Sequence, residues 1–454
     1  MLHYRRNQRP VGHGCFHSGH LWLEGEPEVF RYIYDCGAKR RHYRESEINA
    51  YLAMFPGEAK LDVLFISHLH ADHVNGLNHL LASVKCDTAV IPYVSPFERL
   101  CFVTADVASG SPDFDRLQFV LDPVGWLSVR GVGTIIVASG EEGGPSLPGP
   151  GPSMGPNEFR DRHGIRLDLK PGKPISPKQA GTNPIISGAP SRSTSVRHLI
   201  HTMPLLLDGP SGSTLTWEFL TYVHPEDKRM QMFRALVRNE FPKLAAVLQK
   251  NRLRFDTRPL IDILKTTAQR NVLVQIFRHV FPSLNATSLC LYSGPSPSAT
   301  DPNIGRLARA CLGHGIANDG HVAHPAECRA LPIYESWQAL ESYQPRCGWL
   351  GTGDSELSSP ERRRLFLEHY AKYTNNTTTF LLPHHGSRDN FHEQIAELRI
   401  PLYSVAAPSG STHHPHREVL RSIRRANCLP VVTTNIPTSA LCECGVLKHA
   451  YRAG

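Results

Sequence analysis

Four side chains of types that commonly bind metal ions lie close together in the chain: His68, His70, Asp72 and His73. His68 and His70 flank a single residue, so both rings can point the same way from an extended turn. Asp72 and His73 follow at once, and their side chains can face a second point nearby. Imidazole and carboxylate ligands without a thiolate suit zinc, manganese, iron or nickel. The spacing therefore predicts that this turn holds two divalent cations, rather than being a surface loop of a chain with 25 histidines.

The residues around this turn predict the elements that hold it in place. Residues 63–66 form a continuous apolar run, which is typical of a strand buried on both faces of a sheet. Beyond the turn, apolar residues recur at helical spacing at Val74, Leu77, Leu80 and Leu81. The stretch is therefore interpreted as strand, turn and helix. In layered α/β folds, ligands gather beyond the carboxyl ends of strands, where this turn lies.

The run from His68 to His73, HLHADH, resembles the HxHxDH signature of the metallo-β-lactamase superfamily. The resemblance implies an α/β fold, namely an αββα sandwich, and a hydrolytic site that usually contains two metal ions. Three downstream stretches narrow the resemblance to the branch related to the competence DNA-uptake protein ComEC. The resemblance covers residues 10–110 and 214–436 of this sequence. The membrane channel of ComEC has no counterpart in it.

The first of these stretches, WLGTGD, ends at Asp354 and resembles the family's strand followed by a Gly-Asp turn. The resemblance implies that Asp354 bridges the two metals. A carboxylate suits this role because it can give one oxygen to each cation, which a single histidine nitrogen cannot do. The alternative is a capping aspartate before a helix expected at residues 360–370.

The second stretch, FLLPHHGSRDN, resembles the HHGS element of the same branch. It implies that one of His384 and His385 binds the second metal, while the other contacts substrate or transfers a proton; the sequence leaves this assignment open. We adopt His385 as the expected ligand, and Asp72, His384 and His385 as the expected catalytic residues. Ser387 and Arg388 are candidates for holding an anionic oxygen of the substrate.

The third stretch, LNATSLCLYSG, resembles an element in which the chain turns through an asparagine near a Ser-Leu pair and enters a strand. It implies that Asn285 and Ser288 lie near the substrate or behind the metal ligands. The β-lactamase branch would carry a metal-binding histidine here, and this sequence has none at the matching place. Weak substitute candidates are His224, His321 and His324.

Asp35 ends an expected strand at residues 29–34. The family often carries an aspartate at the end of an early strand, where it supports the metal site from behind the ligands. An ordinary turn aspartate before Gly37 is an equally weighted alternative. Farther along, residues 411–420, STHHPHREVL, resemble the family's HPHPEVL stretch, with Arg417 in place of the second proline.

Patterns outside these motifs predict the remaining elements. Strands are expected at residues 88–92, 119–121, 133–138, 214–223, 403–406 and 431–435. Helices are expected at residues 45–54, 226–250 with a break at Pro242, and 259–281. A metallo-β-lactamase-like domain would then span residues 1–436. It would contain a Gly/Pro/Ser-rich, disordered insertion at 139–195 and a helical insertion at 226–281, with a C-terminal tail at 437–454.

Composition bounds the functional classes. The chain has 454 residues, of which 41% are hydrophobic, so it can form a substantial core. It lacks an apolar stretch long enough to span a membrane and an N-terminal secretory signal. Its 11 cysteines are scattered and odd in number, which favours reduced thiols and a cytoplasmic location. The net charge of +8 permits an anionic partner such as DNA without requiring one.

Together, these observations predict a metallohydrolase with two divalent cations, zinc or alternatively manganese. His68 and His70 would hold the first cation, Asp72, His73 and His385 the second, and Asp354 would bridge them. A hydroxide shared by the cations would be the nucleophile. The branch implies a phosphodiesterase or nuclease acting on DNA or another phosphodiester. Alternatives are hydrolysis of lactones, thioesters or other small esters, and a non-catalytic module that the metals stabilise.

Overall fold

The computed structural model describes two large mixed sheets with helices on their outer sides, so the predicted α/β class is confirmed. The described residues are 1–26, 29–55, 60–110, 114–140, 166–169, 194–208, 216–226, 228–250, 255–281, 287–297, 305–312, 329–330 and 346–448. In this part of the chain, no helix is both long and apolar enough to cross a lipid bilayer.

The first sheet has the strand order β13-β12-β18-β1-β2-β3-β4-β5-β6-β8. From β3 to β8 the strands are parallel, and the others pair antiparallel. The bounds are β1 (Leu2–Gln8), β2 (Phe16–Leu23), β3 (Val29–Cys36), β4 (Lys60–Phe65), β5 (Lys85–Pro92), β6 (Thr134–Ser139), β8 (Ser195–Ile200), β12 (Gly305–Leu312), β13 (Arg329–Ala330) and β18 (Leu441–Lys448).

The second sheet has the order β17-β16-β15-β14-β11-β10-β9-β7. Its strands from β14 to β17 are parallel, and the rest pair antiparallel. The bounds are β7 (Arg166–Leu169), β9 (Leu205–Asp208), β10 (Thr216–Val223), β11 (Leu289–Pro295), β14 (Gly348–Gly351), β15 (Thr377–Leu381), β16 (Leu402–Ala406) and β17 (Leu429–Thr433).

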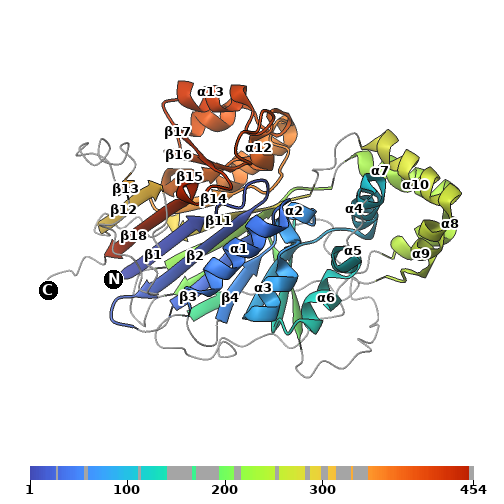
Figure 1. The fold of residues 1–454 in the computed structure, drawn as a ribbon, viewed down its shortest axis with the longest axis horizontal. Coiled ribbons are helices and arrows are strands. Elements are labelled where there is room, and N and C mark those ends of the chain that lie inside the picture. Colours follow the sequence, from blue (N-terminus) through green and yellow to red (C-terminus); the bar gives the residue numbers. More distant parts are fainter. Residues whose placement is uncertain are drawn as a thin grey trace.

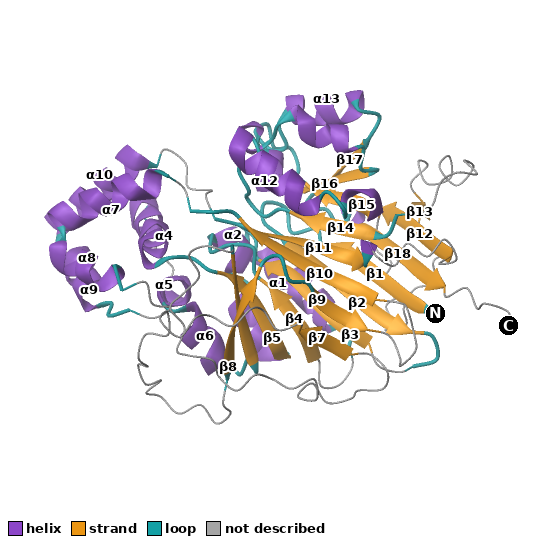
Figure 2. Cartoon of the chain, turned by 180° about the vertical axis from the view of Figure 1, so that it is seen from behind, coloured by secondary structure: helices purple, strands orange, loops and turns teal. Residues whose placement is uncertain are grey.

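Helices cover both outer faces of this pair of sheets (Figure 1). On the first sheet lie α1 (Arg41–Leu52), α2 (Ala71–Val74), α3 (Leu77–Ser83), α5 (Phe114–Leu121) and α6 (Pro123–Val129), and α4 (Pro96–Ser109) packs against α5 beside them. On the second lie α12 (Pro360–Tyr370) and α13 (Arg417–Arg425). Figure 2 shows α7 (Arg229–Glu240), α8 (Pro242–Leu248), α9 (Arg258–Lys265) and α10 (Thr267–Val280) gathered beside α4, to one side of the sheets.

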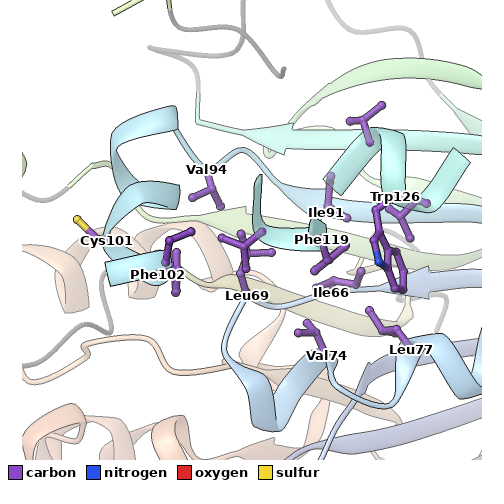
Figure 3. Close-up of a cluster of buried hydrophobic side chains, with 14 of the residues drawn as sticks. Ile66, Leu69, Val74, Leu77, Ile91, Val94, Cys101, Phe102, Phe119 and Trp126 are labelled. Carbon is purple, nitrogen blue, oxygen red and sulfur yellow. The ribbon is translucent and has the colours of Figure 1, made fainter. Parts of the chain in front are cut away.

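Strand β4 anchors the turn from His68 to His73, which is named the metal turn because metal binding is predicted there. Val63 and Phe65 are buried in the core between the sheets, whereas Leu64 and Ile66 are buried in the core under the helices. Leu69, which separates the two histidines of the turn, is 1% exposed and joins the second of these cores (Figure 3). Full burial of such a side chain contributes about 1.5–3 kcal/mol, so the turn is anchored at its centre.

Three sequence expectations differ from the structure. Residues 119–121 belong to α5 rather than to a strand, because Phe119 packs against Trp126 of the next helix. Such short apolar runs do not distinguish the two states. The helix expected at 259–281 is two helices, which meet at Thr266. Residues 441–448, expected in a tail, form β18, which pairs in register with both β1 and β12.

Most of the insertion expected at 139–195 lies outside the described residues, so its disorder remains a prediction. Within that range, Arg166–Leu169 forms β7 and pairs with β9 at the edge of the second sheet. Pro242 does separate two helices, α7 and α8, as its lack of a backbone donor predicts.

Buried neutral histidines make the stability of the metal-free protein depend on pH. Burial lowers the pKa of His369 to about 3, although its ring nitrogen Nε2 contacts the carbonyl of Thr221 at 3.0 Å. In the unfolded chain the pKa of a histidine is about 6.5. The contribution of neutral His369 to the free energy of unfolding is therefore fully present above pH 6.5 and is lost as the pH falls toward 3. Between these two pH values, each such histidine should lower the free energy of unfolding by about 1.4 kcal/mol for every unit by which the pH falls. Chemical unfolding in chelator at several pH values measures it, and His369→Gln should show a shallower decline. Equal slopes in both proteins would contradict the prediction.

Candidate metal centre

Two histidines of the metal turn, His68 and His70, converge on one carboxylate oxygen of Asp354. His68 and His70 lie between the end of β4 and the start of α2. The His68 Nε2 and His70 Nδ1 atoms are 3.0 Å apart. They lie 3.4 and 3.5 Å from Oδ2 of Asp354, respectively. His68 is buried and His70 is half-buried. These three side chains can therefore hold one cation.

The other oxygen of Asp354 faces a different group. Its Oδ1 atom lies 3.4 Å from Nε2 of His73. The turn after β14 places the carboxylate, because Gly353 has a φ of 53° and a Cβ there would approach the Ser67 side chain to 2.9 Å. The backbone N–H of Asp354 donates to Oγ of Ser288 at 3.0 Å. Asp354 thus presents one oxygen to each of two ligand groups, which is the arrangement that a bridging carboxylate requires.

Asp35 lies behind His73. It is the penultimate residue of β3 and lies in the left-handed backbone region, with a φ of 58°, and its side chain is fully buried. Its Oδ2 atom lies 2.7 Å from Nδ1 of His73. Its oxygens also accept hydrogen bonds from the backbone N–H and hydroxyl of Ser67. When His73 Nδ1–H donates to Asp35, the lone pair of Nε2 is directed toward Asp354.

A second group of potential ligands forms around Asp72. Nε2 of His385 lies 3.2 Å from Oδ2 of Asp72, and Nδ1 of His385 lies 2.9 Å from the carbonyl oxygen of Ala406. The latter contact fixes the tautomer that leaves Nε2 free to bind a cation. Nitrogen atoms of His385 and His73 also lie within 4.8 Å of a carboxylate oxygen of Asp354. His385 therefore joins both groups.

His384 occupies a different position from its neighbour. Its Nε2 atom is 3.9 Å from Oδ2 of Asp354, and its Nδ1 atom is 3.0 Å from Oδ1 of Asn390. Both histidines adopt left-handed backbone conformations, with φ of 45° at His384 and 53° at His385, and such strain accumulates at functional sites. The geometry favours His385 as the ligand near Asp72. His384 lies near Oδ2 of Asp354, the oxygen that faces His68 and His70.

The remaining predicted residues lie elsewhere. Ser387 caps a short 3₁₀ turn by accepting from the N–H of Asp389. The exposed Arg388 pairs with Glu418 at 3.0 Å. His224 is buried against the Tyr222 ring and belongs to none of the potential ligand groups among the described residues. Asn285, His321 and His324 lie outside the described residues.

His13 is the site residue that the sequence patterns did not reveal. It lies in the turn between β1 and β2, and its Nε2 atom is 3.4 Å from Oδ2 of Asp72. Its ring is 4.3 Å from that of His385 and 5.9 Å from that of His414. No ligand spacing links it to the HLHADH run, and the two glycines that flank it, Gly12 and Gly14, are its only local signal.

The electrostatics of the group suit a cation. Burial by itself would raise the pKa of Asp354, but the neighbouring imidazoles of His68, His384 and His73 hold it well below its usual range. Burial disfavours protonated His73, yet the charges of Asp35 and Asp354 raise its pKa well above 6.5, so a cation at Nε2 would have to displace a proton. Burial lowers the pKa of His68 to about 4, so its ring is neutral at pH 7. Anionic carboxylates and neutral imidazoles are the forms that bind metals.

Two orphaned atoms provide a direct test of whether cations fit. Nε2 of His73 and Oδ1 of Asp354 are both buried and form no hydrogen bond, although they are 3.4 Å apart. Two ligand atoms that bind zinc at about 2.1 Å in a tetrahedral arrangement would be ~3.4 Å apart. The other contacts to Asp354 and Asp72 described above for His68, His70, His385 and His13 span 3.2–3.5 Å. The donor types and their spacing therefore fit a site of two divalent cations.

Comparison with known proteins adds no identification. The chain matches no protein-family model, and no curated protein matches it.

Proposed function

We propose that this protein is a metal-dependent phosphodiesterase or nuclease with a dinuclear site of the metallo-β-lactamase type. The observation that carries the proposal is the position of Asp354, whose two oxygens face separate groups of histidines at 3.4–3.5 Å. The pairing of two sheets with helices on both outer faces agrees with the αββα sandwich that this superfamily would require.

The proposed ligands divide between two cations, zinc or alternatively manganese. The first would be held by His68, His70 and Asp354, and the second by Asp72, His73, His385 and Asp354. Such cations supply a nucleophilic water near neutral pH and positive charge for oxygens that become negative in the transition state. Asp35 holds the tautomer of His73, and the carbonyl of Ala406 holds that of His385.

His384 is the residue best placed to move a proton. Asn390 contacts its Nδ1 atom and itself donates to the backbone carbonyl of Asp354. Nε2 of His384 lies 3.9 Å from Oδ2 of Asp354, a position from which it can exchange a proton with a substrate at the proposed site. A leaving alkoxide oxygen of a phosphodiester needs such a proton, and positioned histidines contribute typically 10²–10⁴-fold to such steps.

A basic surface begins close to this site. Helix α13 carries Arg417, Arg421, Arg424 and Arg425, all exposed, and none of them forms an ion pair within the described part of the chain. The backbone N–H of His416, the N-cap of α13, donates to the carbonyl of Gly386 in the HHGS turn at 3.0 Å. Figure 1 shows α13 beside β16 and β17, on the outer side of the second sheet. An arginine-rich helix next to the site suits a polyanionic substrate.

This surface is a better candidate for contacting phosphates than the Lys/Arg-rich stretch from Lys228 to Arg254, the other basic segment of the sequence. In that stretch, Lys228 pairs with Glu361, Arg229 with Glu356 and Arg234 with Glu226. Those cations are partly neutralised by their own protein, whereas the arginines of α13 are not. We therefore propose that the phosphate backbone of the substrate lies along α13.

A substrate panel tests the proposed function. The wild-type protein, loaded with zinc or manganese, is assayed on single- and double-stranded DNA, RNA, bis-p-nitrophenyl phosphate, a lactone and a β-lactam. We expect metal-dependent cleavage of phosphodiesters, with nucleic acid binding that weakens steeply as salt increases. Turnover of the lactone or β-lactam alone would contradict the substrate class. Bound metal without any turnover would favour a binding module.

A further inference from the structure

We propose that His13 is a protein ligand of the second cation, additional to Asp72, His73, His385 and Asp354. The inference rests on the proposed dinuclear site and assigns that site a ligand from the N-terminal hairpin, which lies far from the other ligands in sequence. It adds a third imidazole to the cation site that already has the larger number of proposed ligands.

The backbone around His13 is fixed against the metal turn. The N–H of Cys15 donates to the carbonyl of Asp72 at 3.1 Å, and the carbonyl of His13 accepts from the N–H of Lys39 at 2.7 Å. Gly14 has a φ of 149°, and a Cβ there would lie 2.4 Å from the Gly37 carbonyl oxygen and 2.8 Å from that of Asp72. This close approach requires glycine, and the preceding side chain, His13, lies beside the Asp72 carboxylate.

The side-chain distances match those of the other proposed ligands. Nε2 of His13 is 3.4 Å from Oδ2 of Asp72, and Nε2 of His385 is 3.2 Å from the same oxygen. A ligand atom from each of these three residues lies within 4.8 Å of the others. His13 is half-buried, so its imidazole is held near the carboxylate while a path to solvent remains. One cation can contact all three side chains.

The two cation sites would then differ in their donors. The first has two imidazoles and a share of Asp354, whereas the second has three imidazoles, its own carboxylate Asp72 and the other share of Asp354. More anionic and imidazole donors favour tighter binding, particularly of zinc. The second site should therefore fill before the first when metal is added to the metal-free protein.

Metal titration of two His13 variants tests the assignment. His13→Ala removes the imidazole, and His13→Gln removes it while retaining a side chain that can hydrogen-bond to Asp72. The metal-free full-length proteins are titrated with cobalt, whose visible absorption reports its ligand set, and then with zinc in competition with a chromophoric chelator. His42→Ala, which removes an exposed histidine of α1, serves as the matched control.

In wild type and His42→Ala, we expect two binding phases. In both His13 variants, the tighter phase should weaken by at least about tenfold and its cobalt spectrum should change, while the weaker phase stays within about twofold. Wild-type affinity in His13→Gln would show that His13 only hydrogen-bonds to Asp72, and would overturn the inference. Unchanged binding in both variants would overturn it as well. If wild type bound no cation, both the proposed function and this inference would fail.

Discussion

Replacing both Asp72 and His385 with alanine is expected to reduce phosphodiester hydrolysis by on the order of 10³-fold or more while the protein stays folded. The two side chains meet at 3.2 Å and form the centre of the proposed second cation site. Without them, only His13, His73 and Asp354 would remain to hold that cation. A loss of 10³-fold corresponds to about 4 kcal/mol of transition-state stabilisation, which is within the range that metal catalysis supplies.

The measurement is kcat/KM on the most active substrate of the panel, with circular dichroism and thermal unfolding to verify the fold. A double variant of two exposed residues, His42→Ala with Asp389→Ala, controls for the number and type of substitutions. It should retain wild-type activity within about twofold. Equal activity of the Asp72/His385 variant and wild type would show that the hydrolysis comes from a contaminant.

Replacing Asp354 with alanine should reduce the metal content from two cations per chain to one or none. Both proposed cations share this carboxylate, so its removal weakens two sites at once, whereas the loss of any single histidine weakens one. The buried His73 would also lose one of the two carboxylates that raise its pKa. Elemental analysis of protein purified without chelator measures the effect.

A second readout separates metal loss from unfolding. Bound cations stabilise the native state by mass action, so chelator should lower the melting temperature of wild type much more than that of Asp354→Ala. Asp389→Asn, a change at an exposed aspartate near the HHGS turn, should behave as wild type. The bridging role of Asp354 would be refuted by a variant that retained two cations, or by wild-type protein that contained only trace metal.

The metal turn could be predicted from sequence because all of its determinants are local. These determinants lie within one short segment of the sequence. They are a strand buried on both faces, two histidines separated by one residue, and an Asp-His pair at the start of a helix. The spacing of such residues is fixed by backbone geometry, whatever the rest of the fold. The same holds for strand β3, for β10 and for the break at Pro242.

Short or edge elements were predicted less well, because their state depends on what they pack against. Phe119 lies in a helix, from which its ring packs against Trp126 and into the core under α5 and α6. Residues 441–448 form strand β18 because they pair by hydrogen bonds with β1 on one side and β12 on the other. Neither partner is visible in a local window of sequence, so tertiary pairing outweighed local propensity.

Local patterns predicted the strand, turn and helix around His68–His73 and indicated downstream side chains of ligand type. Their grouping arises from the fold. The adjacent parallel strands β14 and β15 place Asp354 and the His384–His385 pair beyond their carboxyl ends, in the second sheet. The β1–β2 hairpin brings His13 to Asp72, and the left-handed turn at His384 and His385 directs the two rings to different partners. These choices depend on sheet order and on backbone contacts between distant segments, and neither leaves a spacing in the sequence that could be recognised.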